Sequence, residues 1–134
     1  MIPSGNTLLT AELEVVTMPS KQHRMILDGN RIISTCDNLK AVEQTVFKIL
    51  NTQRYAYIIY SWNYGIELED LFGQPVYYVC PEIERRVREA LLQDDRITAV
   101  DNFEFDFPKR GVVATKFIVH TIVGDLEEEM VVNI

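Results

Sequence analysis

Apolar and polar residues alternate with a period of two through the C-terminal third of the sequence. Phenylalanines at 103, 105 and 107 are separated by acidic residues, so a strand here has one aromatic and one acidic face. β-branched residues dominate 112–123, and a second alternation follows on one face at Leu126, Glu128, Met130 and Val132. Turn sequences at 108–111 and at Gly124-Asp125 separate these runs. The pattern predicts a three-stranded antiparallel meander.

Two segments before the meander have helical periodicity instead. Asp37 or Asn38 is expected to cap a first helix that runs to about Asn51, with one apolar face made by Leu39, Val42, Val46, Ile49 and Leu50. Pro81 is expected in the first turn of a second helix, where its missing N–H costs nothing. The apolar face of this second helix comprises Ile83, Val87, Ala90 and Leu91. Glu82–Arg86, Glu84–Arg88 and Arg85–Glu89 are each four residues apart on its wet side.

The N-terminal half contains weaker signals. The apolar runs 24–27 and 30–33 flank Asp28-Gly29, a pair that can supply the positive φ angles of a hairpin turn. Residues 55–60 are aromatic and β-branched, which fits either a short strand or a buried extended run. Residues 1–21 fit an extended arm. We therefore expect a small α+β protein with an arm (1–21) and one domain (22–134), in which two helices pack on an antiparallel sheet.

The charge of the chain argues against two classes of partner. The 134 residues include 20 acidic and 13 basic side chains, a net charge of −7. Such a field repels phosphate backbones and anionic lipid surfaces, so we expect neither a nucleic acid nor a membrane as partner. The N-terminal residues do not resemble a secretory signal, so we expect no leader, and no run approaches the roughly 20 apolar residues of a membrane span.

The residues that usually carry chemistry are sparse. Cys36 and Cys80 lack metal-ligand spacing, and we interpret both as buried small residues of a reduced protein. His23 and His120 have no nucleophile or metal motif beside them, so His120 is expected to be a core or cross-strand histidine. The glycines do not form a phosphate-binding loop. We expect no cofactor, no metal and no catalytic residue.

Three carboxylates close together in sequence provide the one enzymatic alternative. Glu67, Glu69 and Asp70 could supply an acid/base pair for a muramidase-like hydrolase of the cell wall. Sequence proximity does not create the required separation across a cleft, and an acidic protein contains such clusters by chance. We interpret the three residues as solvated or interface carboxylates.

The segment Tyr60-Ser61-Trp62-Asn63-Tyr64-Gly65 is the most unusual in the chain. Buried aromatic residues with polar tips serve equally in a corner of a core and in a recognition surface. We interpret this segment as a core corner, with the recognition surface as the alternative.

Residues 60–73 together with 84–97 resemble prophage tail proteins of the phage-like-element tail component group, a divergent branch of the baseplate wedge or sheath initiator family of contractile tails. The resemblance covers roughly residues 22–134. A Glu-Pro-Arg signature after the long helix of that family corresponds here to Asp94-Asp95-Arg96, without the proline. A second family motif is matched loosely by Asn51-Thr52-Gln53-Arg54 and by Tyr64-Gly65. The resemblance thus implies these partner-binding residues: Arg96, Asp94, Asp95, Arg54, Trp62, Tyr64 and Gly65.

The resemblance also implies a function without catalysis. Such a protein is a structural component of a contractile phage-like tail baseplate, assembled in the bacterial host cytoplasm, with one copy per wedge of a sixfold assembly. Its partners would be other baseplate wedge proteins and the tail sheath protein, whose arms add strands to an exposed sheet edge that residues 127–129 protect beforehand. Alone it would be a monomer or a weak oligomer. A small adaptor or regulatory domain remains the alternative. In the baseplate interpretation, Trp62 and Tyr64 shape the fold, while Arg96 and the C-terminal edge contact partners.

Overall fold

The computed structural model describes residue 16 and residues 19–134 of the chain. Its elements are β1 (Gln22–Ile26), the 3₁₀ turn η2 (Leu27–Gly29), β2 (Arg31–Cys36), α1 (Asn38–Leu50), the 3₁₀ turn η3 (Glu69–Leu71), α2 (Val76–Leu91), β3 (Ile97–Lys109), β4 (Val112–Thr121) and β5 (Gly124–Asn133). This order confirms the α+β class. The expected arm falls mostly on residues outside the described part of the chain.

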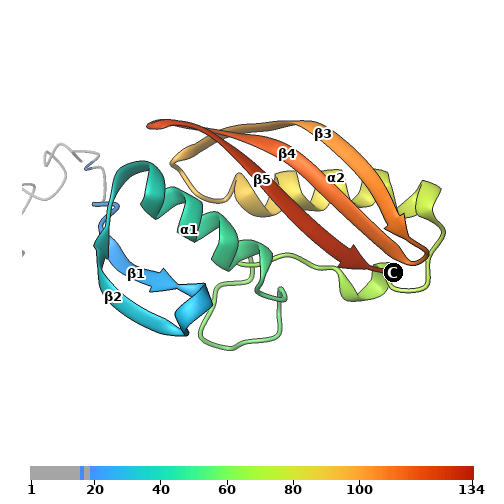
Figure 1. The fold of residues 1–134 in the computed structure, drawn as a ribbon, viewed down its shortest axis with the longest axis horizontal. Coiled ribbons are helices and arrows are strands. Elements are labelled where there is room, and N and C mark those ends of the chain that lie inside the picture. The colour runs from blue at the N-terminus through green and yellow to red at the C-terminus, as the bar shows by residue number, and fades with distance from the viewer. Residues whose placement is uncertain (1–15, 17–18) are drawn as a thin grey trace, which may run out of the picture.

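The sheet β3-β4-β5 is the predicted antiparallel meander, and both helices lie against one of its faces (Figure 1). Helix α2 packs under β3, whereas α1 packs beside β5 and carries the β1–β2 hairpin on its other side. β4 and β5 pair without interruption from Val112↔Asn133 to Thr121↔Gly124. The expected turn at Gly124-Asp125 is wrong by two residues: the turn is Ile122-Val123, where the Thr121 hydroxyl donates to the Gly124 carbonyl at 2.6 Å.

The core lies between this sheet and the two helices. Its centre is Phe117 of β4, which is 2% exposed and stacks on Phe103 with ring centroids 5.3 Å apart. The predicted apolar faces of both helices are buried here through Val42, Val46, Ile49, Ile83, Val87, Ala90 and Leu91. Of the predicted aromatic face of β3, Phe103 and Phe105 pack on the core. Phe107 is exposed, and it lies in a stretch where the register with β4 shifts.

Helix α2 begins at Val76, so the prediction that Pro81 lies in its first turn is wrong. Pro81 is inside the helix, where it cannot donate the usual backbone hydrogen bond. Burial compensates, because Val79 is fully buried one turn before Ile83 and extends the same apolar face. The three Glu–Arg pairs predicted on the wet side all form, with N–O distances of 2.9–3.1 Å.

The β1–β2 hairpin is also confirmed, but its turn is built differently from the expected Asp-Gly turn. Residues 27–29 form a single 3₁₀ turn, and Asn30 takes the left-handed conformation with φ 46°. Asparagine tolerates this conformation better than most residues with a side chain. Helix α1 starts as predicted, with the Asp37 carboxylate accepting a hydrogen bond from the Asn38 N–H at 2.7 Å.

Candidate functional site

Residues 55–64 form a loop, which we call the aromatic loop. The two chain segments on either side of it are hydrogen-bonded to each other. The Arg54 N–H donates to the Ile66 carbonyl at 3.0 Å, and the Ile66 N–H donates to the Thr52 carbonyl at 2.9 Å. Gly65 lies beside this closure with φ 96°, and a Cβ on it would be 2.6 Å from the Thr52 oxygen. Only glycine fits such a position without displacing backbone. The chain is therefore closed tightly at the base of the loop.

The Arg54 side chain links the aromatic loop to helix α2. Its Nε donates to the Trp62 carbonyl at 2.8 Å, and Nη1 pairs with Glu89 at 3.0 Å. The same guanidinium lies 4.9 Å from the ring centroid of Tyr55, a cation–π distance. Arg54 thus holds the loop to α2, and its guanidinium is already bonded to groups of the same chain.

Most of the large side chains of the aromatic loop are exposed. Trp62 is 81% exposed and Ile59 is 85% exposed, and Tyr55, Tyr57 and Ile58 are exposed with them. Both alternatives for 55–60 are therefore wrong, since this segment is neither a strand nor buried, and Trp62 is not in a core corner. Tyr64 does pack against the core and stacks on Tyr60 with centroids 4.4 Å apart. A contiguous apolar surface of this kind is typical of a protein–protein contact.

The three residues that correspond to the family signature are divided in the structure. Arg96 bonds Asp94 and also donates from Nη2 to the Thr45 hydroxyl of α1 at 3.1 Å. Burial alone would raise the pKa of Asp94, but the hydrogen bonds from Arg96 outweigh it and hold this pKa below its usual value. Asp95, in contrast, points to solvent. Arg96 and Asp94 thus join the start of the meander to α1, and Asp95 is the exposed member of the three.

Strand β5 forms one edge of the meander, and in the described residues no strand pairs with its outer side. The Ile134 N–H donates to the Gly111 carbonyl at 2.7 Å, which places 111 and 134 in a hydrogen-bonded pair. Such pairs alternate along an antiparallel ladder, so even-numbered residues of β5 bond to β4. The backbone N–H and C=O groups of odd-numbered residues, including Glu127 and Glu129, therefore point outward from the edge.

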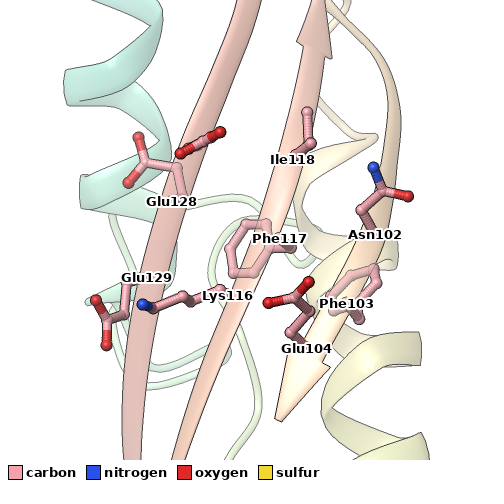
Figure 2. Close-up of a pocket in the computed structure, with 9 residues that line it drawn as sticks. Asn102, Phe103, Glu104, Lys116, Phe117, Ile118, Glu128 and Glu129 are labelled. Carbon is pink, nitrogen blue, oxygen red and sulfur yellow. The ribbon is translucent and has the colours of Figure 1, made fainter. Parts of the chain in front are cut away.

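The solvent face of the meander is acidic. Lys116 lies between Glu104 of β3 and Glu129 of β5 in the strand register (Figure 2). His120 bridges Asp125 and Asp101 at 2.8 and 2.9 Å, and these two hydrogen bonds raise its pKa. The cross-strand alternative for His120 is thereby confirmed.

The three carboxylates of the hydrolase alternative are all exposed, at the start of and just before η3. Asp70 pairs with Arg86, whose Nη2 lies 2.8 Å from Oδ2, and this bond lowers the pKa of Asp70. A general acid needs the opposite shift. Arg86 also donates to the Glu67 carbonyl at 2.8 Å, so this cluster is joined to α2.

Two further expectations concern single residues and metal sites. Cys36 and Cys80 are free thiols but half-buried rather than buried: Cys80 packs against the rim of the core, and Cys36 lines a groove beside α1. In residue 16 and residues 19–134, no group of three metal-ligating side chains comes together. Within the same residues, neither helix is long and apolar enough to cross a bilayer.

The chain matches a known family and a known protein over most of its length. The family model of the contractile injection system sheath initiator matches residues 15–124. The chain is also 38% identical over 130 residues to the phage-like element PBSX protein XkdS of Bacillus subtilis (strain 168), which covers 93% of this chain and 90% of that protein. The match extends through both helices and most of the meander, and it supports a structural role in a contractile tail. The chain belongs to the sheath initiator family of contractile injection systems.

Proposed function

We propose that this protein is the baseplate subunit that links the wedge of a contractile phage-like tail to its sheath. The sheath would be started by strand addition, in which a segment of the tail sheath protein pairs with the outer side of β5. No catalytic step is needed for this role. One copy per wedge in a sixfold baseplate, assembled in the host cytoplasm, follows from the same proposal.

The observation that carries the proposal is the free edge of β5. Odd-numbered residues 125–133 direct their backbone hydrogen-bonding groups outward, in a register without a bulge. An uninterrupted edge of this kind is a template for an added strand. Glu127 and Glu129 are exposed beside it, and their charge disfavours pairing between two copies of the chain.

The aromatic loop supplies a second surface, which we assign to the wedge. It is built from a different part of the chain than β5. Its exposed tryptophan and tyrosines are the residue types that dominate binding energy in protein interfaces. Asp95, exposed in the turn between α2 and β3, is a further candidate contact.

A proline in the edge strand tests the proposal. Deletion of β5 would remove Met130 and Val132 from the core, so its effect on assembly would be ambiguous. Glu129→Pro instead removes one outward N–H and leaves the ladder to β4 intact, a change that edge strands tolerate. We expect a folded protein that reaches baseplates but gives particles without sheaths in electron micrographs.

The matched control is Glu129→Ala, which removes the same side chain and keeps the N–H. Particles with this variant should have normal sheaths. Normal sheaths on Glu129→Pro particles would show that β5 does not template the sheath.

A further inference from the structure

A groove of about 240 Å³ lies where the hairpin, α1 and β5 meet. Much of its wall is apolar, and Phe47 of α1 and Leu27 of the hairpin are exposed in it. The residues that line it are Arg24, Met25, Leu27, Cys36, Lys40, Glu43, Gln44, Phe47 and Glu128. The groove therefore adjoins the edge strand to which the proposed function assigns the sheath segment.

Glu128 is the one charged residue in the inward-facing row of β5. Its neighbours in that row are Leu126, Met130 and Val132, which all pack on the core. The Glu128 side chain is half-buried and extends from β5 toward α1 (Figure 2). Desolvation, and then the charge of Glu43, raise the pKa of Glu128 to about 7.

No cation in the described part of the chain forms an ion pair with Glu128. Lys40 is paired with Glu43, at 3.3 Å. Arg24 lines the groove but forms no ion pair there among the described residues. The inner side of the edge thus holds two carboxylates, Glu43 and Glu128. Among the described residues of the free chain, only Glu43 has a cation partner, which is Lys40. A positive charge supplied from outside would complete the site.

The register of β5 shows where such a charge would have to lie. In a strand added beside β5, the residue opposite Glu128 would have its Cβ roughly 4.5–5.5 Å from the Cβ of Glu128 and would face the same side. The residues two positions before and after it would lie beside Leu126 and Met130, over apolar surface. This arrangement is the same for either direction of the added strand.

We propose that the segment added to β5 has the pattern apolar-x-Lys/Arg-x-apolar, with its basic residue paired to Glu128 and Glu43. This inference rests on the proposed function and adds the feature by which the edge selects its partner. Backbone pairing alone accepts any extended segment, whereas a half-buried carboxylate pair disfavours a strand with an apolar or acidic residue at the central position.

The test measures binding of the purified full-length chain to the purified tail sheath protein by calorimetry at pH 8. Glu128→Gln should bind about tenfold more weakly, since one half-buried ion pair is lost. Glu127→Gln, a change of the same chemistry on the outward face, should bind as the unchanged chain does. Binding of the unchanged chain should weaken from pH 8 to pH 6 as Glu128 gains a proton, and Glu128→Gln should lose this dependence.

A charge swap identifies the partner residue. Glu128→Lys should abolish binding, and replacing the basic residue of the sheath segment with Glu should restore it.

Glu129→Pro distinguishes the two proposals. Full binding by Glu128→Gln with loss of binding by Glu129→Pro would overturn the selection by charge and leave strand addition intact. Full binding by both variants would overturn strand addition itself, and the inference with it.

Discussion

The guanidinium of Arg96 forms a two-point ion pair with the carboxylate of Asp94, with N–O distances of 2.9 and 2.6 Å. Both side chains are mostly shielded from solvent, at 18% and 13% exposure. The pair lies at the junction between α2 and the meander and bonds Thr45 of α1. The resemblance to the family implies that these residues contact a partner, and the geometry adds a role within the fold.

Arg96→Ala should therefore destabilise the free protein. It leaves the Asp94 carboxylate half-buried without its partner, at a cost of about 1–2 kcal/mol in the free energy of unfolding. Urea denaturation measures this loss. Arg85→Ala, which removes an exposed arginine of α2, should cost less than about 0.5 kcal/mol. Equal stabilities for the two variants would contradict a structural role for Arg96.

Glu128→Gln should stabilise the free chain above pH 7. The folded-state pKa of Glu128 is about 7, against an ordinary value of 4.5, so the folded chain binds more protons between these pH values. Stability therefore falls as the pH rises through this window. We expect a gain of about 1–2 kcal/mol from Glu128→Gln at pH 8, after allowance for solvent screening, and little gain at pH 4. Urea denaturation at both pH values checks this, with Glu127→Gln as the control that should not change.

Gly65→Ala should cost far more than Gly73→Ala. Both glycines have positive φ, at 96° and 79°, so alanine is strained at either position by about 1–2 kcal/mol. A Cβ at Gly73 meets no atom within 4 Å, whereas one at Gly65 lies 2.6 Å from the Thr52 carbonyl. We expect a loss of about 3 kcal/mol or more for Gly65→Ala, measured by thermal unfolding. Similar losses of stability for both variants would show that the backbone at the base of the aromatic loop can move to accept a Cβ at little cost.

Trp62→Ala should leave stability within about 0.5 kcal/mol, since the side chain is largely exposed. As the only tryptophan in the chain, Trp62 reports its surroundings directly by fluorescence. Acrylamide should quench it almost as it quenches free tryptophan, and binding of the wedge protein should protect it. Strong protection in the free chain would place the ring in a buried site.

Period-two and helical patterns predicted most of the fold because burial on one face leaves a regular trace in the sequence. The meander, the apolar face of α1 and the charged pairs of α2 were all predictable for this reason. The start of α2 was missed because proline is typical of a first helical turn, although Val79, Ile83 and Val87 recur every four residues on one buried face. The turns were missed because a side chain decides them: Asn30 takes the strained conformation, and the Thr121 hydroxyl closes the second turn.

The candidate surfaces were harder to predict than the fold. An aromatic, β-branched segment has the same composition in a core as in an interface, so the exposure of 55–62 could not be derived from composition. Arg54 was expected as a partner contact from the resemblance, but its bonds to the Trp62 carbonyl and to Glu89 depend on how the loop and α2 come together in the fold. The sequence predicted that the C-terminal strand forms a free edge. It did not predict that Glu128 lies beside Glu43, because that contact depends on the position of α1.

The closure at the base of the aromatic loop also determines how readily this part of the chain can change over evolution. Because Thr52 and Ile66 hold the two ends together, the segment between them contributes little to the core, and each doubling of its length would cost only about 0.6 kcal/mol of closure entropy. Insertions, deletions and new side chains are therefore tolerated here more readily than in β5, where every second residue packs inward.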